Sequence, residues 1–251
     1  MKNKFRTIIF ASAFTSLVIS GCDKAKEVVD DNTPDTNTPS APSITMGDGY
    51  GVLAAVRSVS ETTVAGITIP LEVNTAVAGF SNALGSNSFV DGGTVTINSK
   101  ALTKSSNNAY AYQNLTDPLS FGSISWNVTG SSSVPAISYT DDKQIPGYSG
   151  YSSLPSTVTR SAGLTISLGS AISGADSIYV VVTDYDSHQL IKRLGGNAAE
   201  CVIGASELSG FTAGQGMIQV CPWNYKSEDF NSRKFYFVIE SAYTKQGITI
   251  N

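Results

Sequence analysis

The chain is poor in the residues from which ionic and metal-dependent sites are built. Only 14% of its 251 residues are charged, and it has one histidine and three cysteines. Soluble proteins carry about 25% charged residues, so the composition argues against a disordered charged chain and against a coiled coil. The histidine and cysteines are too few for a zinc cluster or a multi-histidine site.

Basic residues are also outnumbered. The chain has 16 Lys and Arg against 20 Asp and Glu, which gives a net charge of −4 and an isoelectric point near 5.0. Electrostatic nucleic-acid binding needs an excess of basic side chains that neutralise phosphates. We therefore expect no nucleic-acid partner.

The N-terminal apolar run is too short to cross a membrane. Ile8 to Ile19 is 12 residues, whereas a spanning helix needs about 20. The run follows Lys2, Lys4 and Arg6, which is the order of a secretory signal peptide. It leads directly into the sequence Ile-Ser-Gly-Cys, which ends at Cys22.

Small residues before a single cysteine resemble the lipobox of bacterial lipoproteins. The resemblance implies that residues 1–22 are a lipoprotein signal peptide and that Cys22 is acylated and becomes the mature N-terminus. Several acyl chains on one residue anchor a protein stably. We therefore expect a lipid-anchored bacterial cell-envelope protein, at the outer membrane rather than the inner membrane. The alternative is an ordinary secretory signal with a coincidental cysteine.

Residues 23–43 have the composition of a linker. They are charged at first, then rich in Thr, Pro, Asn and Ser, without apolar periodicity. A flexible chain of this length spans roughly 25 Å. The folded part is thus expected to stand off the membrane surface.

From residue 44 onward the pattern is all-β. Short runs rich in Val, Ile, Thr, Tyr and Phe are broken by Gly, Ser, Asn and Pro, and no run has a helical period over three turns. The expected strands are 50–59, 63–73, 93–98, 109–113, 121–129, 136–140, 163–168, 177–184, 189–194, 200–204, 216–222, 234–243 and 246–250. Strands at this spacing are typical of β-sandwiches.

Three runs show which faces are buried. In 121–129 apolar and polar residues alternate, which places Trp126 in a core. The run 177–183 is apolar on both faces and predicts a central strand. In 234–240 the phenylalanines share one face, and the other face is only partly polar, with Glu240 on it.

A domain boundary is expected where apolar periodicity lapses, in 141–157. It divides the body into two sandwich-sized domains, 44–150 and 151–251. The alternative is one larger sandwich.

The C-terminal half resembles the immunoglobulin-like domains of envelope lipoproteins of the Bacteroidetes. The segments that carry the resemblance are 161–166, 175–179 and 234–237. The resemblance implies a fold of two immunoglobulin-like antiparallel β-sandwiches and an envelope location, and it carries no activity.

Two cysteines remain once Cys22 is lipidated. An even pair in an exported domain is a candidate disulfide. If the strands that hold Cys201 and Cys221 pair antiparallel, the two side chains share a face, and the bridge contributes roughly 3 kcal/mol. The alternative is two buried free thiols.

Asp184 and Asp186 are the candidate metal ligands. Two carboxylates two residues apart in a loop offer oxygen ligands to Ca²⁺, the one cofactor that the sequence suggests. The alternative is a plain turn, because Asp and Ser are ordinary turn residues. The adjacent His188 cannot form a triad with its sequence neighbours, and we expect no enzyme.

Aromatic residues in loops are the candidate ligand-binding groups. Tyr148 and Tyr151 lie in a Gly/Ser-rich segment, and Trp223 and Tyr225 follow a predicted strand. Exposed aromatic rings stack on sugars, so these residues are candidates for binding glycans. The alternative is that they pack at a domain junction.

The sequence therefore predicts a non-catalytic structural, adhesive or ligand-binding role at the envelope. Its partners are the membrane, through the lipid anchor, and a glycan or an envelope protein. One specific alternative is a carbohydrate-binding module of a polysaccharide-uptake system, which requires an exposed, coplanar aromatic patch that includes Trp223. The other is a fimbrillin-like fibre subunit, which requires an incomplete sheet edge and strand exchange between copies.

Overall fold

The computed structural model describes residues 27–29, 48–64, 67–86, 88–186 and 188–251. Within them the fold is all-β, as predicted, with short 3-10 turns in place of longer helices. The predicted signal peptide, Cys22 and all of the predicted linker except Glu27–Val29 lie outside these residues. No helix of the described part is long and apolar enough to cross a bilayer.

The structure has eighteen described strands and two described 3-10 helices. In chain order they are β1 (Glu27–Val29), β2 (Gly51–Val64), β3 (Ile67–Phe80), β4 (Val95–Ile97), β5 (Lys100–Ala101), β6 (Thr103–Lys104), β7 (Tyr110–Gln113), β8 (Ile124–Val128), β9 (Ile137–Asp141), β10 (Gly147–Tyr148), η3 (Tyr151–Ser153), β11 (Thr157–Val158), β12 (Leu164–Ser167), η4 (Gly169–Ala171), β13 (Ile172–Ser173), β14 (Ser177–Asp184), β15 (Gln189–Gly195), β16 (Glu200–Ile203), β17 (Gly214–Phe230) and β18 (Arg233–Ile250).

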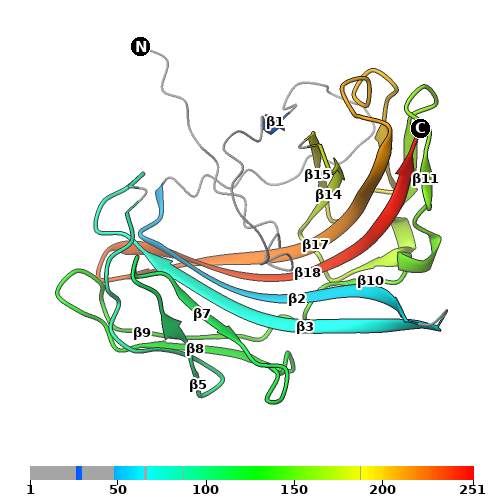
Figure 1. Cartoon of the computed structure of the whole chain (residues 1–251). Helices are drawn as coiled ribbons and strands as arrows, with labels where there is room; N and C mark the ends of the chain where they lie inside the picture. The colour runs from blue at the N-terminus through cyan, green and yellow to red at the C-terminus, as the bar shows by residue number, and fades with distance from the viewer. Residues whose placement is uncertain (1–26, 30–47, 65–66, 87, 187) are drawn as a thin grey trace, which may run out of the picture.

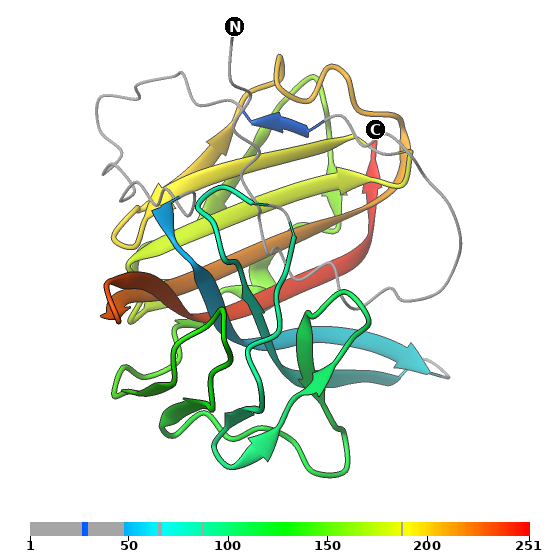
Figure 2. The same ribbon diagram turned by 90° about the vertical axis from the view of Figure 1, so that its left-hand side faces the viewer.

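One large sheet runs through the molecule. Its strand order is β1-β15-β14-β17-β18-β2-β3-β7-β6, with β11 paired to the far end of β18. Most neighbours are antiparallel, and the parallel pairs are β1 with β15, β18 with β2, and β11 with β18. Figure 2 looks onto β15, β14, β17 and β18 in this order. Smaller sheets pack on one side of the large sheet: β5-β4-β8-β9, β12-β16 and β10-β13.

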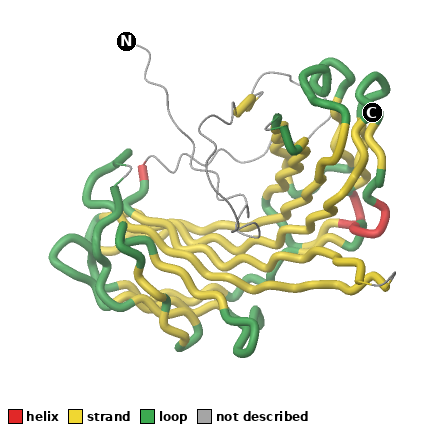
Figure 3. Tube along the Cα trace, in the orientation of Figure 1, coloured by secondary structure: helices red, strands yellow, loops and turns green. Residues whose placement is uncertain are grey.

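The four longest strands lie side by side and curve along the length of the molecule (Figure 1). β17 has 17 residues and β18 has 18, three times an ordinary strand. A two-residue turn joins them, in which Asn231 and Ser232 have φ values of 50° and 60°. Two positive φ values are the requirement of a type I′ hairpin, whose twist matches the strands. Loops gather at the ends of the strands (Figure 3).

A first apolar core lies between the large sheet and the four-stranded sheet. Trp126 of β8 and Phe235 and Phe237 of β18 are each 1% exposed in it. Tyr139 of β9 stacks on Phe237 with ring centroids 3.7 Å apart. The predicted burial of Trp126 is therefore confirmed.

A second apolar core lies between the other half of the large sheet and the two-stranded sheets. Ile178, Val180 and Val182 of β14 are fully buried in it, as are Ile218 and Val220 of β17. The two-stranded sheets β12-β16 and β10-β13 cover this side. Because β14 lies between β15 and β17, it is the central strand that its sequence predicts.

Strand β18 serves both cores. Its first half supplies Phe235 and Phe237 to the first core, and its second half supplies Ile248 and Ile250 to the second. The predicted domains 44–150 and 151–251 are thus joined by a continuous sheet. The boundary between them stays a prediction.

The predicted disulfide between Cys201 and Cys221 is wrong, and both residues are free and buried. β16 pairs with β12, so Cys201 faces the second core, whereas β17 pairs with β14 and β18. Val220 points into the second core, so its neighbour Cys221 points to the opposite side of the sheet. Burial raises the pKa of Cys201 to about 12 and that of Cys221 well above its usual value, which makes both thiols poor nucleophiles.

Candidate ligand-binding site

The side of the large sheet that faces away from both cores carries a third cluster of buried residues. We call this side the concave face, because the sheet curves toward it (Figure 1). Buried Ala54, Val56, Trp223 and Val238 form the cluster, and half-buried Tyr179 and Tyr225 pack against it. These residues occupy the positions that alternate with the core residues along each strand.

Aromatic rings form a continuous row on this face. The rings of Tyr179 on β14 and Trp223 on β17 are parallel to within 4°, with centroids 5.3 Å apart. Tyr225 lies 5.7 Å from Trp223, and Tyr236 of β18 lies 6.2 Å from Tyr225. Offset parallel packing of this kind is favourable for aromatic rings. Trp223 is only 3% exposed at the centre of the row.

Arg193 of β15 lies over the two parallel rings. Its Cζ is 5.8 Å from the centroid of Trp223 and 6.0 Å from that of Tyr179. Arg193 is directly opposite Tyr179 in the antiparallel register of β14 and β15, which places it on the same face. The position satisfies the geometry of a cation–π contact.

Several buried polar atoms of this face have no hydrogen-bond partner. Among the described residues these include Nε and Nη2 of Arg193, Nε1 of Trp223 and Oγ of Ser177. Ser177 is directly opposite Trp223 across the pairing of β14 with β17. A buried donor without a partner costs free energy comparable to a lost hydrogen bond, so such atoms need a partner to explain them.

Glu240 of β18 adds an acid to the concave face. It is directly opposite Trp223 in the pairing of β17 with β18 and is 6% exposed. Burial raises the pKa of Glu240 to about 7, and a hydrogen bond with the Cys221 thiol opposes part of the rise. The carboxyl group therefore titrates near neutral pH.

The four predicted aromatic residues do not form one site. Trp223 and Tyr225 meet on the concave face, but Tyr148 and Tyr151 pack around Tyr243 at the second core. The hydroxyl of Tyr151 also donates to the carbonyl of Thr244. Trp223 is buried, stacked on Tyr179 and tilted by 32° to Tyr225, so these rings do not form the exposed, coplanar patch that a carbohydrate-binding module was expected to show.

Sequence reasoning missed three members of the cluster, namely Tyr179, Arg193 and Glu240. The alternation of 177–183 and 234–240 does place Tyr179 and Glu240 on the faces opposite the core residues. Arg193 carried no such signal, because it becomes a neighbour only through the pairing of β15 with β14.

Asp184 organises the turn between β14 and β15. Its Oδ1 accepts hydrogen bonds from the backbone N–H groups of Asp186 and His188, and its Oδ2 accepts one from Thr212. His188 Nδ1 lies 2.8 Å from the same Oδ2. Burial would raise the pKa of Asp184, but the hydrogen bonds from Thr212 and His188 lower it below its usual value. This geometry explains Asp184 as a turn former, and calcium binding by Asp184 and Asp186 stays a prediction.

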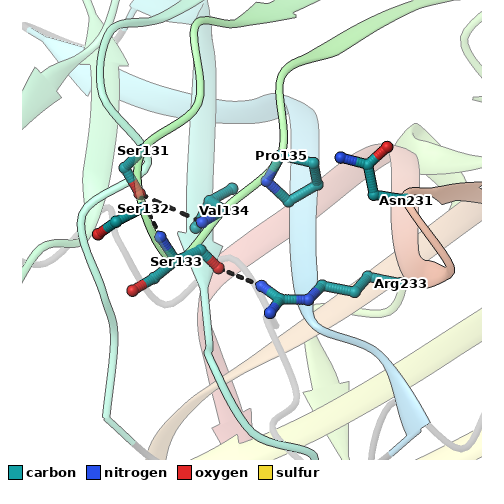
Figure 4. Close-up of a pocket in the computed structure, with 7 residues that line it drawn as sticks. All are labelled: Ser131, Ser132, Ser133, Val134, Pro135, Asn231 and Arg233. Atoms are coloured by element: carbon teal, nitrogen blue, oxygen red, sulfur yellow. Dashed lines mark hydrogen bonds between the residues drawn. The ribbon is translucent and has the colours of Figure 1, made fainter.

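A small pocket of about 220 Å³ lies at the opposite end of the molecule, beside the hairpin of β17 and β18 (Figure 4). Arg233 donates through Nη1 to the carbonyl of Ser133 and lies over the ring of Tyr50 at 5.2 Å. The guanidinium thus ties the 131–135 loop to the hairpin. The hydrogen bond of Arg233 stabilises the fold, whereas Nε and Nη2 of Arg193 have no hydrogen-bond partner among the described residues.

No protein-family model matches the chain, and neither a curated protein nor a solved structure matches it. The aromatic rings of the concave face provide stacking surfaces, and its N–H donors provide directional contacts, which is the usual composition of a small-ligand site.

Proposed function

We propose that this protein is a non-catalytic, lipid-anchored cell-envelope protein that binds a saccharide on its concave face. The observation that carries the proposal is the meeting of Trp223, Tyr225, Tyr179 and Arg193 on the side of the sheet that neither core uses. Aromatic rings pack against the apolar faces of sugars, and N–H groups donate to sugar oxygens.

Two parts of the proposal rest on the sequence. Acylation of Cys22 attaches the chain to the envelope, with the outer membrane favoured, and the 23–43 linker separates the body from the bilayer. The immunoglobulin-like nature of the two halves also belongs to the proposal. The packing of a smaller sheet on each half of the large sheet supports it.

Affinity electrophoresis of the mature chain through gels that contain different polysaccharides tests the saccharide proposal. We expect one class of polysaccharide to retard the protein and Trp223→Ala to abolish the retardation. Tyr185→Ala is the matched control, because Tyr185 is a 61% exposed aromatic residue outside the cluster. Unretarded migration in every gel, or equal loss in both variants, would contradict the proposal.

The anchor is tested separately. Mass spectrometry of the membrane-extracted protein should show an acylated N-terminal Cys22, and Cys22→Ser should release the protein into the soluble fraction. An unmodified N-terminus elsewhere in the chain would contradict the lipobox.

A fibre subunit is the second candidate, and strand β1 favours it. Glu27–Val29 pairs in parallel with Gln189–Ile191 at the edge of the large sheet. A short strand on a long connection can equally pair with the same edge of another copy. Sedimentation of the mature chain at increasing concentration tests this, since strand exchange produces oligomers and a monomer at all concentrations rules it out.

A further inference from the structure

We infer that the ligand of the concave face carries a carboxylate and that Arg193 binds it through Nε and Nη2. The inference rests on the proposed saccharide-binding function and narrows it to acidic sugars, the uronates.

The unpaired atoms of Arg193 form one edge of its guanidinium group. Nε–H and Nη2–H point in the same direction and match the two oxygens of a carboxylate. Both atoms are buried and without a hydrogen-bond partner among the described residues. This edge therefore has no internal partner and has the geometry of a bidentate contact, which the side chain would present to a ligand by turning outward.

The other unpaired atoms nearby have the same polarity. Trp223 Nε1 is a donor only, and Ser177 Oγ can donate. A ligand that presents oxygen acceptors would satisfy all four atoms, whereas a cationic ligand would satisfy none of the N–H groups. The set of donors thus selects oxygen acceptors over a cation, and the positive charge of Arg193 favours an acceptor that is an anion.

No acid of the described residues neutralises Arg193. Its guanidinium is absent from every ion pair of this part of the chain. Glu240, the acid on the same face, shares its hydrogen bond with Cys221 instead. A partly buried cation without a counter-charge is unfavourable, and a carboxylate ligand would remove this cost.

The aromatic rings next to Arg193 indicate that the carboxylate is part of a sugar. Arg193 covers the parallel rings of Trp223 and Tyr179. When its side chain lifts to meet a carboxylate, the face of these rings becomes available to the adjoining sugar ring. A uronate carries both groups on one ring, which a neutral sugar and a simple organic anion do not.

Among the described residues, the sheet edge next to Arg193 carries no paired strand. β15 is the last long strand on this side, and its pairing with β1 ends at Ile191, two residues before Arg193. The described residues therefore leave the edge beside Arg193 without a paired strand.

Isothermal titration calorimetry of the mature chain tests the inference. The probes are oligomers of galacturonate, glucuronate and mannuronate, each compared with its fully methyl-esterified form, which keeps the sugar and removes the charge. We expect at least one acid to bind, and its ester and the variant Arg193→Gln each to weaken binding by about tenfold or more.

Lys192→Gln is the matched control. It removes the same charge from the adjacent position of β15, where Lys192 pairs with Glu207 on the core side of the sheet. We expect the control to bind within about twofold of the parent protein, since Lys192 lies on the side of the sheet opposite the proposed site. Arg193→Lys keeps the charge but loses the planar bidentate donor pair, and Trp223→Phe keeps an aromatic ring but loses the indole N–H and part of the ring surface. Both variants should weaken binding.

The outcomes separate the inference from the proposed function. Equal binding of acid and ester, abolished by Trp223→Ala, would overturn the carboxylate inference and leave saccharide binding intact. Undiminished binding by Arg193→Lys or Arg193→Gln, with the circular dichroism of the parent, would overturn it as well. Failure of every acidic and neutral saccharide to bind would overturn both.

Discussion

The two faces of the large sheet are built from the same strands but differ in how their buried polar groups are placed and paired. On the core side, Tyr139 stacks on Phe237 and its hydroxyl donates to Asp141 at 3.2 Å. On the concave face, Trp223 stacks on Tyr179 but its indole N–H has no partner among the described residues. Unpaired buried atoms also occur on the core side, at Arg57 Nε, Asn74 Oδ1 and Ser241 Oγ. The concave face differs in that its unpaired groups gather around one ring, that of Trp223.

The same contrast holds for buried charge. On the core side of the first half, Asp141 is 1% exposed and accepts from the backbone N–H of Lys143 and from Tyr139. On the concave face, Glu240 is 6% exposed and has a thiol as its hydrogen-bond partner. A thiol is a weak donor, so the charge of Glu240 is poorly compensated.

The largest expected effect is on the core face. Phe237→Ala removes a ring that is 1% exposed and stacked on Tyr139, and it should lower the free energy of unfolding by about 3–5 kcal/mol. Urea unfolding followed by fluorescence measures the change. Ligand binding by the folded variant should be unaffected, and a loss of binding without a loss of stability would break the distinction between the two faces.

The next effect is a pH dependence that comes from the concave face. The pKa of Glu240 is about 7 in the folded protein and about 4.3 for an unperturbed glutamate. Between these values the folded state binds one more proton than the unfolded state, so stability falls as pH rises through this window and then stays constant. Above pH 7 the loss amounts to at most about 4 kcal/mol.

Glu240→Gln should remove this dependence. The amide has nearly the same shape and cannot ionise, so the variant should be more stable than the parent protein above pH 7 and differ less at pH 4.5. Urea midpoints measured from pH 4.5 to 8 give the comparison. Parallel curves for the two proteins would show that Glu240 is not the titrating group.

A smaller effect compares one hydroxyl on each face. Tyr139→Phe leaves buried Asp141 without one of its donors and should destabilise the protein by about 1–2 kcal/mol. Ser177→Ala deletes an unpaired hydroxyl and should be neutral or slightly stabilising, because nothing is left unsatisfied. Thermal unfolding of both variants measures this, and an equal loss in both would show that Ser177 has a partner.

The last prediction is that reduction leaves the stability of the protein unchanged. Cys201 and Cys221 are free thiols on opposite sides of the sheet, so a reductant should leave the melting temperature unchanged. Alkylation of the denatured, unreduced protein should label both residues, as mass spectrometry would show. A missing label on this pair would restore the disulfide.

Much of the fold follows from local sequence. The predicted strand 177–184 coincides with β14, and 189–194 differs from β15 by one residue. These strands alternate or are apolar throughout, and a period of two is a local property that a sequence displays directly. The burial of Trp126 follows from the same alternation.

The long strands were harder to predict, because their pairing continues past local breaks. Pro222 ends the predicted strand 216–222, yet β17 runs on to Phe230, and the described pairing with β18 is interrupted between Val220 and Trp223. Proline removes one N–H from the ladder, and an interruption at that point accommodates it. Gly247, with φ of 67°, similarly lies within β18, where the register shifts opposite Gly216.

The sequence by itself determined the all-β class, most strand positions and the presence of Trp223 and Tyr225 as candidate binding residues. The tertiary structure decided that β18 completes both cores, that Cys201 and Cys221 face opposite sides, and that Arg193 lies over Trp223. The physical reason is the range of the contacts. Alternation along one strand is local, whereas neighbours across a sheet, such as β18 and β2, come from opposite ends of the chain.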